Sequence, residues 1–337
     1  MRELIKKLCL TDAPSGKENK VSEFIENELK GHAQVEKDGM GNLIVFKKGK
    51  KKSASKLMCD AHTDEVGMII TGITDDGFLK FYTLGGIETS ALLCKKVLIE
   101  NTVAGVIGIK PVHLCDKDEK SSLPDKDSLY IDIGAENKED AEKVVNIGDY
   151  ATFISDYTNL DCNKIKAKAI DDRIGCAILI SILKEEAEYD FYATFTVQEE
   201  LGVRGARVAA YSVEPQFCIC LEATTAADIH GVSNEYTVCK LGKGPAVSFM
   251  DRATLYDREL YDVALNSGIP CQPKSAVTGG NNSGAIHLSK GGVRTMAISV
   301  PCRYIHSPSG IADLNDAENA KELTKYMINK ICSGEIK

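Results

Sequence analysis

The sequence contains no tryptophan and no long apolar run among its 337 residues. Without tryptophan, nothing in the chain indicates the broad aromatic platform on which a sugar ring stacks, and this argues against a glycoside hydrolase. No apolar segment approaches the roughly 18–20 residues that a membrane-spanning helix requires, so we expect no membrane partner. Residues 1–16 carry interspersed charges and lack the apolar core of a signal peptide, and we therefore expect a cytoplasmic protein.

Positive charge and metal-binding cysteine motifs are scarce as well. Lysine and arginine total 41 against 49 aspartates and glutamates, which gives a net charge of −8. Nucleic-acid-binding domains carry a basic surface, so we expect no nucleic-acid partner. The 12 cysteines include no Cys-x-x-Cys pair, and several of them lie within apolar runs. We interpret them as reduced, buried thiols.

Hydrophobic patterning indicates an α/β protein with a β-rich insertion. Ser15-x-x-Glu18 has the form of a capping box ahead of a helix near the start of the chain. Over residues 67–162, short β-like runs alternate with glycine, aspartate and asparagine, which is typical of a small barrel or sandwich. Strand and helix patterns alternate again after this segment. We therefore predict a discontinuous α/β domain, residues 1–66 and 163–337, with an inserted β-rich domain between its two parts.

Side chains of the kinds that bind metals follow several apolar runs, at points where strands are expected to end. They are His62 in DAHTDEVG, Asp171 in AIDDRIG, the pair Glu199-Glu200 in TVQEELG, Glu222 in CICLEAT and His306 in YIHSPSG. In open α/β sheets, sites form at the carboxyl ends of the strands. Two histidines and three carboxylates suit two divalent ions if one carboxylate bridges them, and one glutamate is left as a general base. The pattern indicates metal-assisted hydrolysis.

Neighbouring residues refine this hypothesis. Asp64 lies two residues after His62 on an extended segment, so it faces the same way and can accept the second ring N–H. Asp171 and Asp172 stand where a loop meets a helix. Asp171 is either a bridging ligand with one oxygen for each ion, or one of a pair of charges that cap the helix.

Two further segments lie where they can contribute to the site. Successive residues at a strand end point in different directions, so one glutamate of Glu199-Glu200 can bind metal while the other moves a proton. The loop Gly280-Asn281-Asn282 is not followed by the lysine of a P-loop, and it forms either a wall of the substrate pocket or a simple turn. No Gly-x-Ser-x-Gly elbow is present, which argues against a serine hydrolase.

Taken in their order and spacing, these motifs resemble those of the di-metal aminopeptidases of the TET or glutamyl (deblocking) aminopeptidase family, whose members are sometimes labelled endoglucanases. The resemblance covers nearly the whole chain. It implies a three-layer αβα metallopeptidase domain with a central mixed sheet. It also implies that the insertion is a small, barrel-like oligomerisation domain, and that the protein forms dimer-based homo-oligomers such as dodecamers. The expected cofactors are two divalent ions per chain, zinc or cobalt.

The same resemblance assigns a role to each site residue. The first ion is expected to be held by His62, Asp171 and Glu222, and the second by Asp171, Glu200 and His306. The two ions therefore share the carboxylate of Asp171. Glu199 is expected to be the general base, and Asp64 the carboxylate that supports the nearby histidine. In the expected mechanism, the ions lower the pKa of a bridging water, and Glu199 takes its proton and later delivers it to the leaving amine.

We therefore expect a metallo-aminopeptidase that removes N-terminal residues from peptides. Two alternatives stay open. A deacylase or carboxypeptidase on the same metal core is favoured by Glu222, because aspartate is commoner at this position in the aminopeptidases. A non-catalytic metal-binding assembly protein is the second alternative, although an adjacent glutamate base argues against it.

Overall fold

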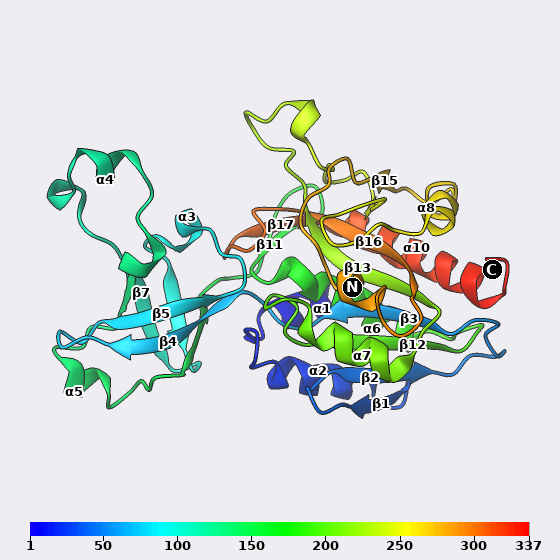
Figure 1. The fold of residues 1–337 in the computed structure, drawn as a ribbon, viewed down its shortest axis with the longest axis horizontal. Coiled ribbons are helices and arrows are strands. Elements are labelled where there is room, and N and C mark those ends of the chain that lie inside the picture. The colour runs from blue at the N-terminus through cyan, green and yellow to red at the C-terminus, as the bar shows by residue number, and fades with distance from the viewer. Residues whose placement is uncertain (337) are drawn as a thin grey trace.

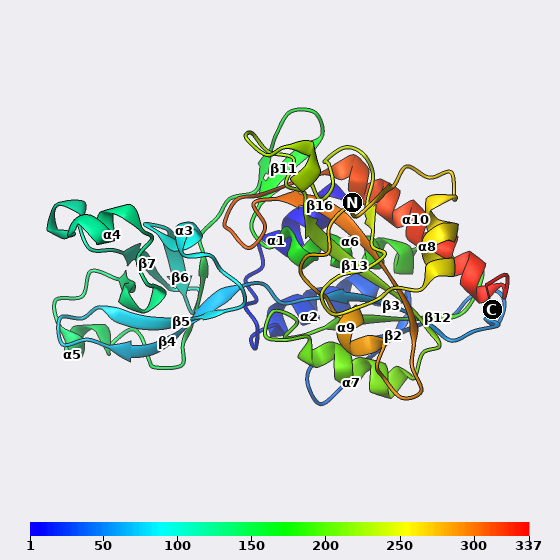
Figure 2. The ribbon, with the colours of Figure 1, turned by 45° about the horizontal axis from the view of Figure 1, so that its top comes forward.

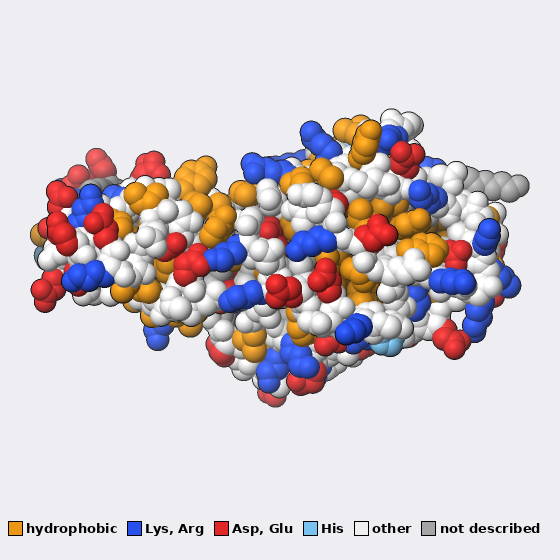
Figure 3. Space-filling model, turned by 90° about the horizontal axis from the view of Figure 1, so that it is seen from below, with side chains coloured by type: hydrophobic (Ala, Val, Ile, Leu, Met, Phe, Trp, Pro, Cys, Tyr) orange, Lys and Arg blue, Asp and Glu red, His pale blue; other side chains and the backbone are white. Residues whose placement is uncertain are grey.

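The structure, a computed structural model, describes residues 1–336. Figure 1 shows two parts side by side. One is an α/β body that contains both ends of the chain, and the other is a smaller β-rich part formed by a segment in the first half of the chain. Among the described helices, none is both long enough and apolar enough to cross a membrane. On the face in Figure 3, acidic and basic side chains are interspersed over the body, and acidic side chains gather at the far end of the β-rich part.

One mixed sheet runs through the α/β body. Its strands are β1 (Gln34–Lys37), β2 (Leu43–Lys47), β3 (Leu57–His62), β10 (Thr158–Asn159), β11 (Lys164–Ala167), β12 (Phe191–Thr196), β13 (Phe217–Thr225), β14 (Ala246–Val247), β15 (Gln272–Pro273), β16 (Arg294–Arg303) and β17 (Gly310–Asp313). They follow the order β1-β2-β12-β3-β13-β16-β17-β11-β10, with β14 paired to β16 and β15 to β14. The central strands β12, β3, β13 and β16 are parallel, and antiparallel strands flank them.

Helices cover both faces of this sheet. They are α1 (Arg2–Cys9), α2 (Asn19–Leu29), α6 (Ile170–Lys184), α7 (Arg204–Val213), α8 (Arg258–Leu265), α9 (Ser283–Ile286) and α10 (Leu314–Cys332), with the short 3-10 helix η3 (Asn234–Tyr236) in a loop. In β3, Leu57 and Cys59 pack into the core that includes α1, α2, α6 and α10, whereas Met58 packs into the core beneath α7 and α9. Figure 2 shows α7 and α9 side by side on this second face. Strands buried on both faces are mostly apolar, which is why the sequence carries near-continuous apolar runs. The predicted three-layer αβα fold is confirmed.

The β-rich part is a closed antiparallel barrel with the strand order β4-β5-β8-β7-β6-β9. Its strands are β4 (Gly67–Ile73), β5 (Leu79–Leu84), β6 (Lys96–Ile99), β7 (Val103–Gly108), β8 (Tyr130–Asp132) and β9 (Tyr150–Phe153). Its short helices are α3 (Thr89–Leu92), η1 (Val112–Leu114), α4 (Lys117–Ser121), η2 (Lys126–Ser128) and α5 (Lys138–Ala141). The inserted barrel is confirmed. The predicted boundary of the inserted domain at residue 162 stays a prediction. Strand β10, which precedes this boundary, pairs with β11 of the large sheet.

Candidate active site

The candidate ligands meet above the carboxyl ends of the parallel strands. His62 is the last residue of β3, and Glu199-Glu200 follow β12. Glu222 lies within β13, which continues to Thr225, so the expectation that this strand ends at Glu222 was wrong. The strand continues because the residues after Glu222 still pair with β16.

A cavity of about 430 Å³ opens over these side chains. Its lining includes acidic, small and hydroxyl-bearing residues from several elements: Asp171, Glu199, Glu200, Glu222, Thr224, Thr225, Lys274, Gly280, Asn281, Ser299 and His306. The lining brings together residues that lie far apart in the sequence. With this volume and these polar side chains, the cavity suits a small polar substrate.

Asp171 lies at the centre of the site, between two imidazoles. Its Oδ1 is 3.2 Å from His62 Nε2, and its Oδ2 is 3.2 Å from His306 Nε2. Burial alone would raise the pKa of the Asp171 carboxyl, but the hydrogen bonds with both imidazoles outweigh it and hold this pKa well below its usual range. One carboxylate thus presents a separate oxygen to each histidine.

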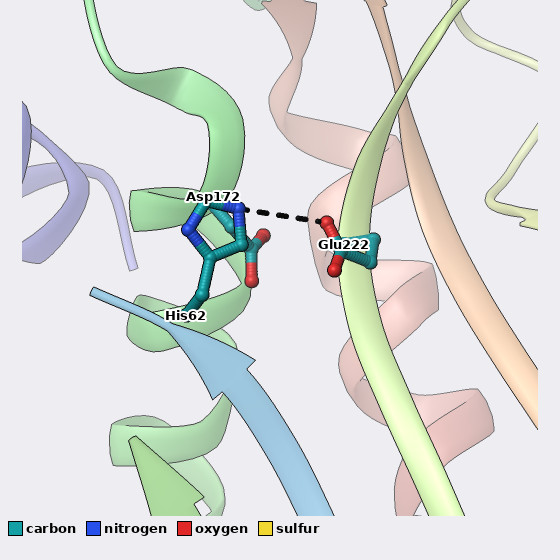
Figure 4. Close-up of side chains that lie close together, drawn as sticks. All are labelled: His62, Asp172 and Glu222. Carbon is teal, nitrogen blue, oxygen red and sulfur yellow. Dashed lines mark ion pairs between the residues drawn. The ribbon is translucent and has the colours of Figure 1, made fainter. Parts of the chain in front are cut away.

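Two groups of ligand-type atoms meet around Asp171, which belongs to the second group and contacts His62 of the first. Within each group the atoms are within 4.8 Å of one another: His62, Asp172 and Glu222 in the first, and Asp171, Glu200 and His306 in the second. Figure 4 shows His62 and Glu222 facing each other, with Asp172 beside them, and the His62 Nε2 to Glu222 Oε2 distance is 3.7 Å. In the second group, His306 Nε2 is 3.3 Å from Glu200 Oε1.

Asp172 is a member of the first group that the sequence did not single out as a ligand. Its side chain is fully buried, and its Oδ1 accepts a hydrogen bond from Gly175 N at 3.1 Å. The backbone dihedrals of Asp171 and Asp172 are non-helical, so this pair does not form an ordinary first helical turn. The bond from Gly175 N, three residues further on, is that of a helix N-cap, so the expected capping role holds for Asp172, while its Oδ2 remains for the ligand group.

The donor set fits divalent cations. Asp172 Oδ2 and Glu222 Oε1 are buried and have no hydrogen-bond partner among the described residues. A buried carboxylate oxygen without a partner is costly unless a cation lies beside it. Imidazole nitrogens mixed with carboxylate oxygens are the ligands that zinc and similar ions take in catalytic sites.

Asp64 supports several parts of the site at once. It is fully buried. Its Oδ1 accepts from Glu199 N at 2.9 Å and lies 3.3 Å from His62 Nδ1. Its Oδ2 accepts from Glu200 N at 3.1 Å and from Ser15 Oγ at 2.6 Å. One carboxylate thereby holds the backbone of both tandem glutamates and lies close to the His62 ring, whose Nδ1 makes no hydrogen bond with the described residues.

The predicted capping box at Ser15 and Glu18 was wrong. Helix α2 begins at Asn19 without a side-chain cap. Ser15 donates its hydroxyl to Asp64 instead, and Glu18 Oε1 accepts from Gly16 N at 2.7 Å and from Gln198 N at 3.1 Å. These long-range partners compete successfully with local capping, and the segment before α2 becomes part of the support of the site.

Glu199 has a buried carboxyl with a raised pKa, as its neighbour Glu200 does. Burial raises the pKa of the Glu199 carboxyl to about 7, and the charges of Asp171 and Asp64 act in the same direction, while His62 opposes them. Its side chain lines the cavity. A pKa close to the working pH suits a general acid or base.

The barrel part of the chain contacts the second ligand group. His306 has a left-handed backbone with φ of 56°, and its Nδ1 is 2.8 Å from the carbonyl oxygen of Gly86 in the loop after β5. If Nδ1 carries the proton, it donates to Gly86 and leaves Nε2 free to bind a cation. A Cβ added at Gly85 would lie 3.0 Å from Glu200 Oε2, so this loop packs directly against the group.

The loop predicted to bind substrate divides into two parts. Gly280 and Asn281 line the cavity. Asn282 is fully buried, and its amide donates to Asp60 Oδ2 at 2.7 Å and to Thr196 Oγ1 at 2.8 Å. Asn282 therefore joins the loop to the sheet and does not reach the cavity, so its expected role in binding substrate is withdrawn.

Comparisons with known proteins match this fold and site. A family model described as M42 glutamyl aminopeptidase matches residues 41–323. The lysyl aminopeptidase of Pyrococcus furiosus is 32% identical over 342 residues, which cover 98% of this chain and 97% of that protein. A solved TET aminopeptidase from a marine-sediment Thaumarchaeota archaeon is 32% identical with a TM-score of 0.94, covering 99% of this chain and 98% of that one.

A second solved structure, of the TET1 peptidase of Pyrococcus horikoshii, is 33% identical with a TM-score of 0.84. The match covers 96% of this chain and 98% of that one, and that peptidase can assemble into a tetrahedron or a large octahedral shell. These findings confirm the resemblance drawn from the motifs. The chain belongs to the M42 glutamyl aminopeptidase family and is a peptide hydrolase.

Proposed function

We propose that this protein is an aminopeptidase that removes N-terminal residues from peptides with the help of two divalent ions, zinc or cobalt. The proposed ligands are His62, Asp171, Glu200, Glu222 and His306, with Asp171 shared. The observation that carries the proposal is the position of Asp171, whose two oxygens each lie 3.2 Å from a different histidine Nε2. When bound, such ions supply Lewis acidity, which polarises a carbonyl and lowers the pKa of a nearby water.

The protein's own groups hold and move the protons. Glu199 accepts the proton of the attacking water at a carboxylate oxygen and returns it to the nitrogen of the leaving amine. Its burial supports this role, because burial raises the pKa of Glu199 to about 7. Asp64 keeps Glu199 in place through the backbone N–H and fixes the His62 ring.

The cleft suits a substrate with a free amine. Four of the charged side chains that line it are carboxylates: Asp171, Glu199, Glu200 and Glu222. Glu199 is the one of these four that is not a proposed metal ligand, so its charge is the one left to attract the positive N-terminus of a peptide. Gly280 and Asn281 line the same cavity and are the proposed substrate contacts of that loop.

Hydrolysis of aminoacyl-p-nitroanilides and matched N-acetylated peptides tests this function. The protein is stripped of metal and then supplied with zinc or cobalt. Metal-restored turnover of free-amine substrates alone is the expected result. Turnover of blocked substrates alone would favour the deacylase alternative, which rests on the longer side chain of Glu222. Bound ions without any turnover would favour the non-catalytic assembly protein.

Glu199→Gln separates chemistry from metal binding. The amide cannot accept the proton of water, so turnover should fall by at least about 10³-fold while the metal content stays at that of the unchanged protein. Glu186→Gln is the matched control, since its side chain is 83% exposed. Turnover by Glu199→Gln at the rate of the unchanged protein would contradict the assigned base.

We also propose that the protein forms dimer-based homo-oligomers, with a dodecamer as the expected assembly. Support comes from the solved TET1 peptidase, whose structure matches 96% of this chain and which can assemble into a tetrahedron or a large octahedral shell. Light scattering coupled to size-exclusion chromatography tests this proposal. A monomer at micromolar concentration would contradict it.

A further inference from the structure

The segment that carries the tandem glutamates is held by side chains from three distant parts of the chain. Val197 N donates to Asn42 Oδ1 at 2.9 Å. Gln198 N donates to Glu18 Oε1 at 3.1 Å. The next two N–H groups, those of the glutamates themselves, donate to the two oxygens of Asp64. Four consecutive backbone N–H groups thus each have a side-chain acceptor.

The backbone of Gln198 needs such support. Strand β12 ends at Thr196, two residues earlier, so the ladder of the sheet does not extend to Gln198. Gln198 has a left-handed backbone with φ of 54° and directly precedes Glu199. A residue with a side chain keeps this conformation only where its surroundings stabilise it. The direction in which the Glu199 side chain leaves the backbone therefore depends on the hydrogen bonds that hold Gln198.

Glu18 is one of the two side chains that hold this backbone. It is 6% exposed, and its Oε1 accepts from Gly16 N at 2.7 Å as well as from Gln198 N. Burial raises the pKa of its carboxyl, and the hydrogen bonds from both N–H groups oppose that shift. Glu18 does not belong to the lining of the cavity, so it can influence the reaction only through the backbone that it holds.

Asn42 holds the preceding residue from the other side. It is fully buried, directly before β2. Its Nδ2 donates to Asp38 Oδ2 at 2.7 Å and to the carbonyl oxygen of Gly205 at 3.0 Å, which leaves Oδ1 to accept from Val197 N. The packing here is tight, because a Cβ added at Gly205 would lie 2.3 Å from Asn42 Oδ1. Like Glu18, Asn42 does not line the cavity.

We propose that Glu18 and Asn42 are positioning residues that fix the direction of the Glu199 side chain. This inference rests on the proposed function, in which Glu199 is the base. A base must lie within hydrogen-bond reach of its proton, and a misplacement of about 1 Å can lower a rate by about 100-fold. Without its acceptor, Gln198 relaxes toward a commoner backbone conformation and turns Glu199 away from the attacking water. The loss should fall on kcat, since neither positioning residue lines the cavity.

The test uses variants of Glu18 in the metal-loaded protein, with the anilide that the unchanged protein cleaves best. Glu18→Met removes both acceptor oxygens and nearly keeps the length of the side chain. We expect kcat to fall by about 10- to 100-fold, with KM within about threefold and the metal content unchanged. Glu18→Gln keeps one oxygen, which can accept from both N–H groups, and should retain at least about a third of kcat. Asn42→Ala should lower kcat in the same way as Glu18→Met.

Asp316→Leu is the matched control. Asp316 is buried and likewise accepts from two backbone N–H groups, those of Gly242 and Gly244, but these residues lie outside the cavity lining. This variant should lose stability and keep its kcat. If Glu18→Met does not fold, Glu18→Asp provides the answer. It keeps the charge but withdraws the oxygen from Gln198 N by about one bond length, so kcat should still fall well below that of Glu18→Gln.

The possible failures are distinct. If the unchanged protein cleaves no anilide with either metal, the proposed function fails and this inference fails with it. If the unchanged protein is active but the Glu18 variants that lack or withdraw the oxygen keep its kcat, only the positioning role is overturned. Equal losses of kcat in Glu18→Gln and Glu18→Met would also overturn it, because the charge of Glu18, and not its acceptor oxygen, would then matter. A loss of bound metal in Glu18→Met would overturn it as well, since Glu18 would then serve the ligands.

Discussion

Replacing Asp64 with asparagine is a sensitive test of how the site is held together. The carboxylate accepts from Ser15 Oγ, Glu199 N and Glu200 N at 2.6, 2.9 and 3.1 Å, and lies 3.3 Å from His62 Nδ1. An asparagine keeps one acceptor oxygen and replaces the other with a donor. The least costly orientation points its oxygen toward His62 and Glu199, because the Ser15 hydroxyl can turn round and accept.

In this orientation the N–H of Glu200 loses its acceptor. An unsatisfied buried N–H costs about 1–3 kcal/mol, and the remaining bonds to Asp64 lose their charge assistance, so we expect the free energy of unfolding to fall by roughly 2–4 kcal/mol. The loss of a carboxylate that supports a histidine ligand typically weakens metal binding by about 10- to 100-fold, and we expect a loss of this size at His62.

Metal titration, steady-state kinetics and chemical unfolding measure these effects on one preparation. Asp316→Asn is the matched control, because this fully buried carboxylate accepts from Gly242 N and Gly244 N, each at 2.7 Å, and does not line the cavity. It should lose stability but keep its metal affinity. Asp64→Asn with unchanged metal affinity and kcat would refute the idea that Asp64 positions the site.

Other perturbations test single contacts. Ser15→Ala removes the 2.6 Å bond to Asp64 and should lower kcat by about tenfold in steady-state assays, whereas Ser15→Thr, which keeps the hydroxyl, should retain most of it. Gly175→Ala would place a Cβ 2.4 Å from an Asp172 oxygen, so metal content measured by mass spectrometry should fall. Removal of metal with a chelator leaves buried carboxylates without a cation, and calorimetry should show Tm falling by several degrees and recovering with zinc; an unchanged Tm would contradict a structural contribution of the ions. Exposed Cys94 should react with iodoacetamide at pH ~8 before buried Cys9, whose pKa burial raises to about 12.

Local patterns in the sequence were enough to predict the layers of the fold. In β3, alternate residues pack into different cores, and an apolar run that is buried on both faces is characteristic of a central strand. The closure of the barrel could not be predicted in this way. It depends on Met68 and Ile69 of β4 pairing with residues of β9, far along the chain, and no local signal specifies that register.

The clustering of the candidate residues was predictable where they follow strands and where spacing fixes direction. Asp64 follows His62 by two residues and faces the same way, with its Oδ1 3.3 Å from His62 Nδ1. Ser15 was mistaken for a helix cap because its true partner lies 49 residues away, whereas the local motif has the spacing of a capping box. Lys274 drew no attention in the sequence, since only the folded chain places it in the lining of the same cavity as Asp171 and Glu222.

The central claim is that Asp171 bridges two ions, and anomalous diffraction from zinc-soaked crystals tests it most directly. We predict two anomalous peaks per chain, one near His62 and Glu222 and the other near Glu200 and His306, with a different oxygen of Asp171 next to each. Asp171→Ala should lose both peaks or retain only one. A single peak in the unchanged protein, or two peaks that Asp171 does not contact, would contradict the claim.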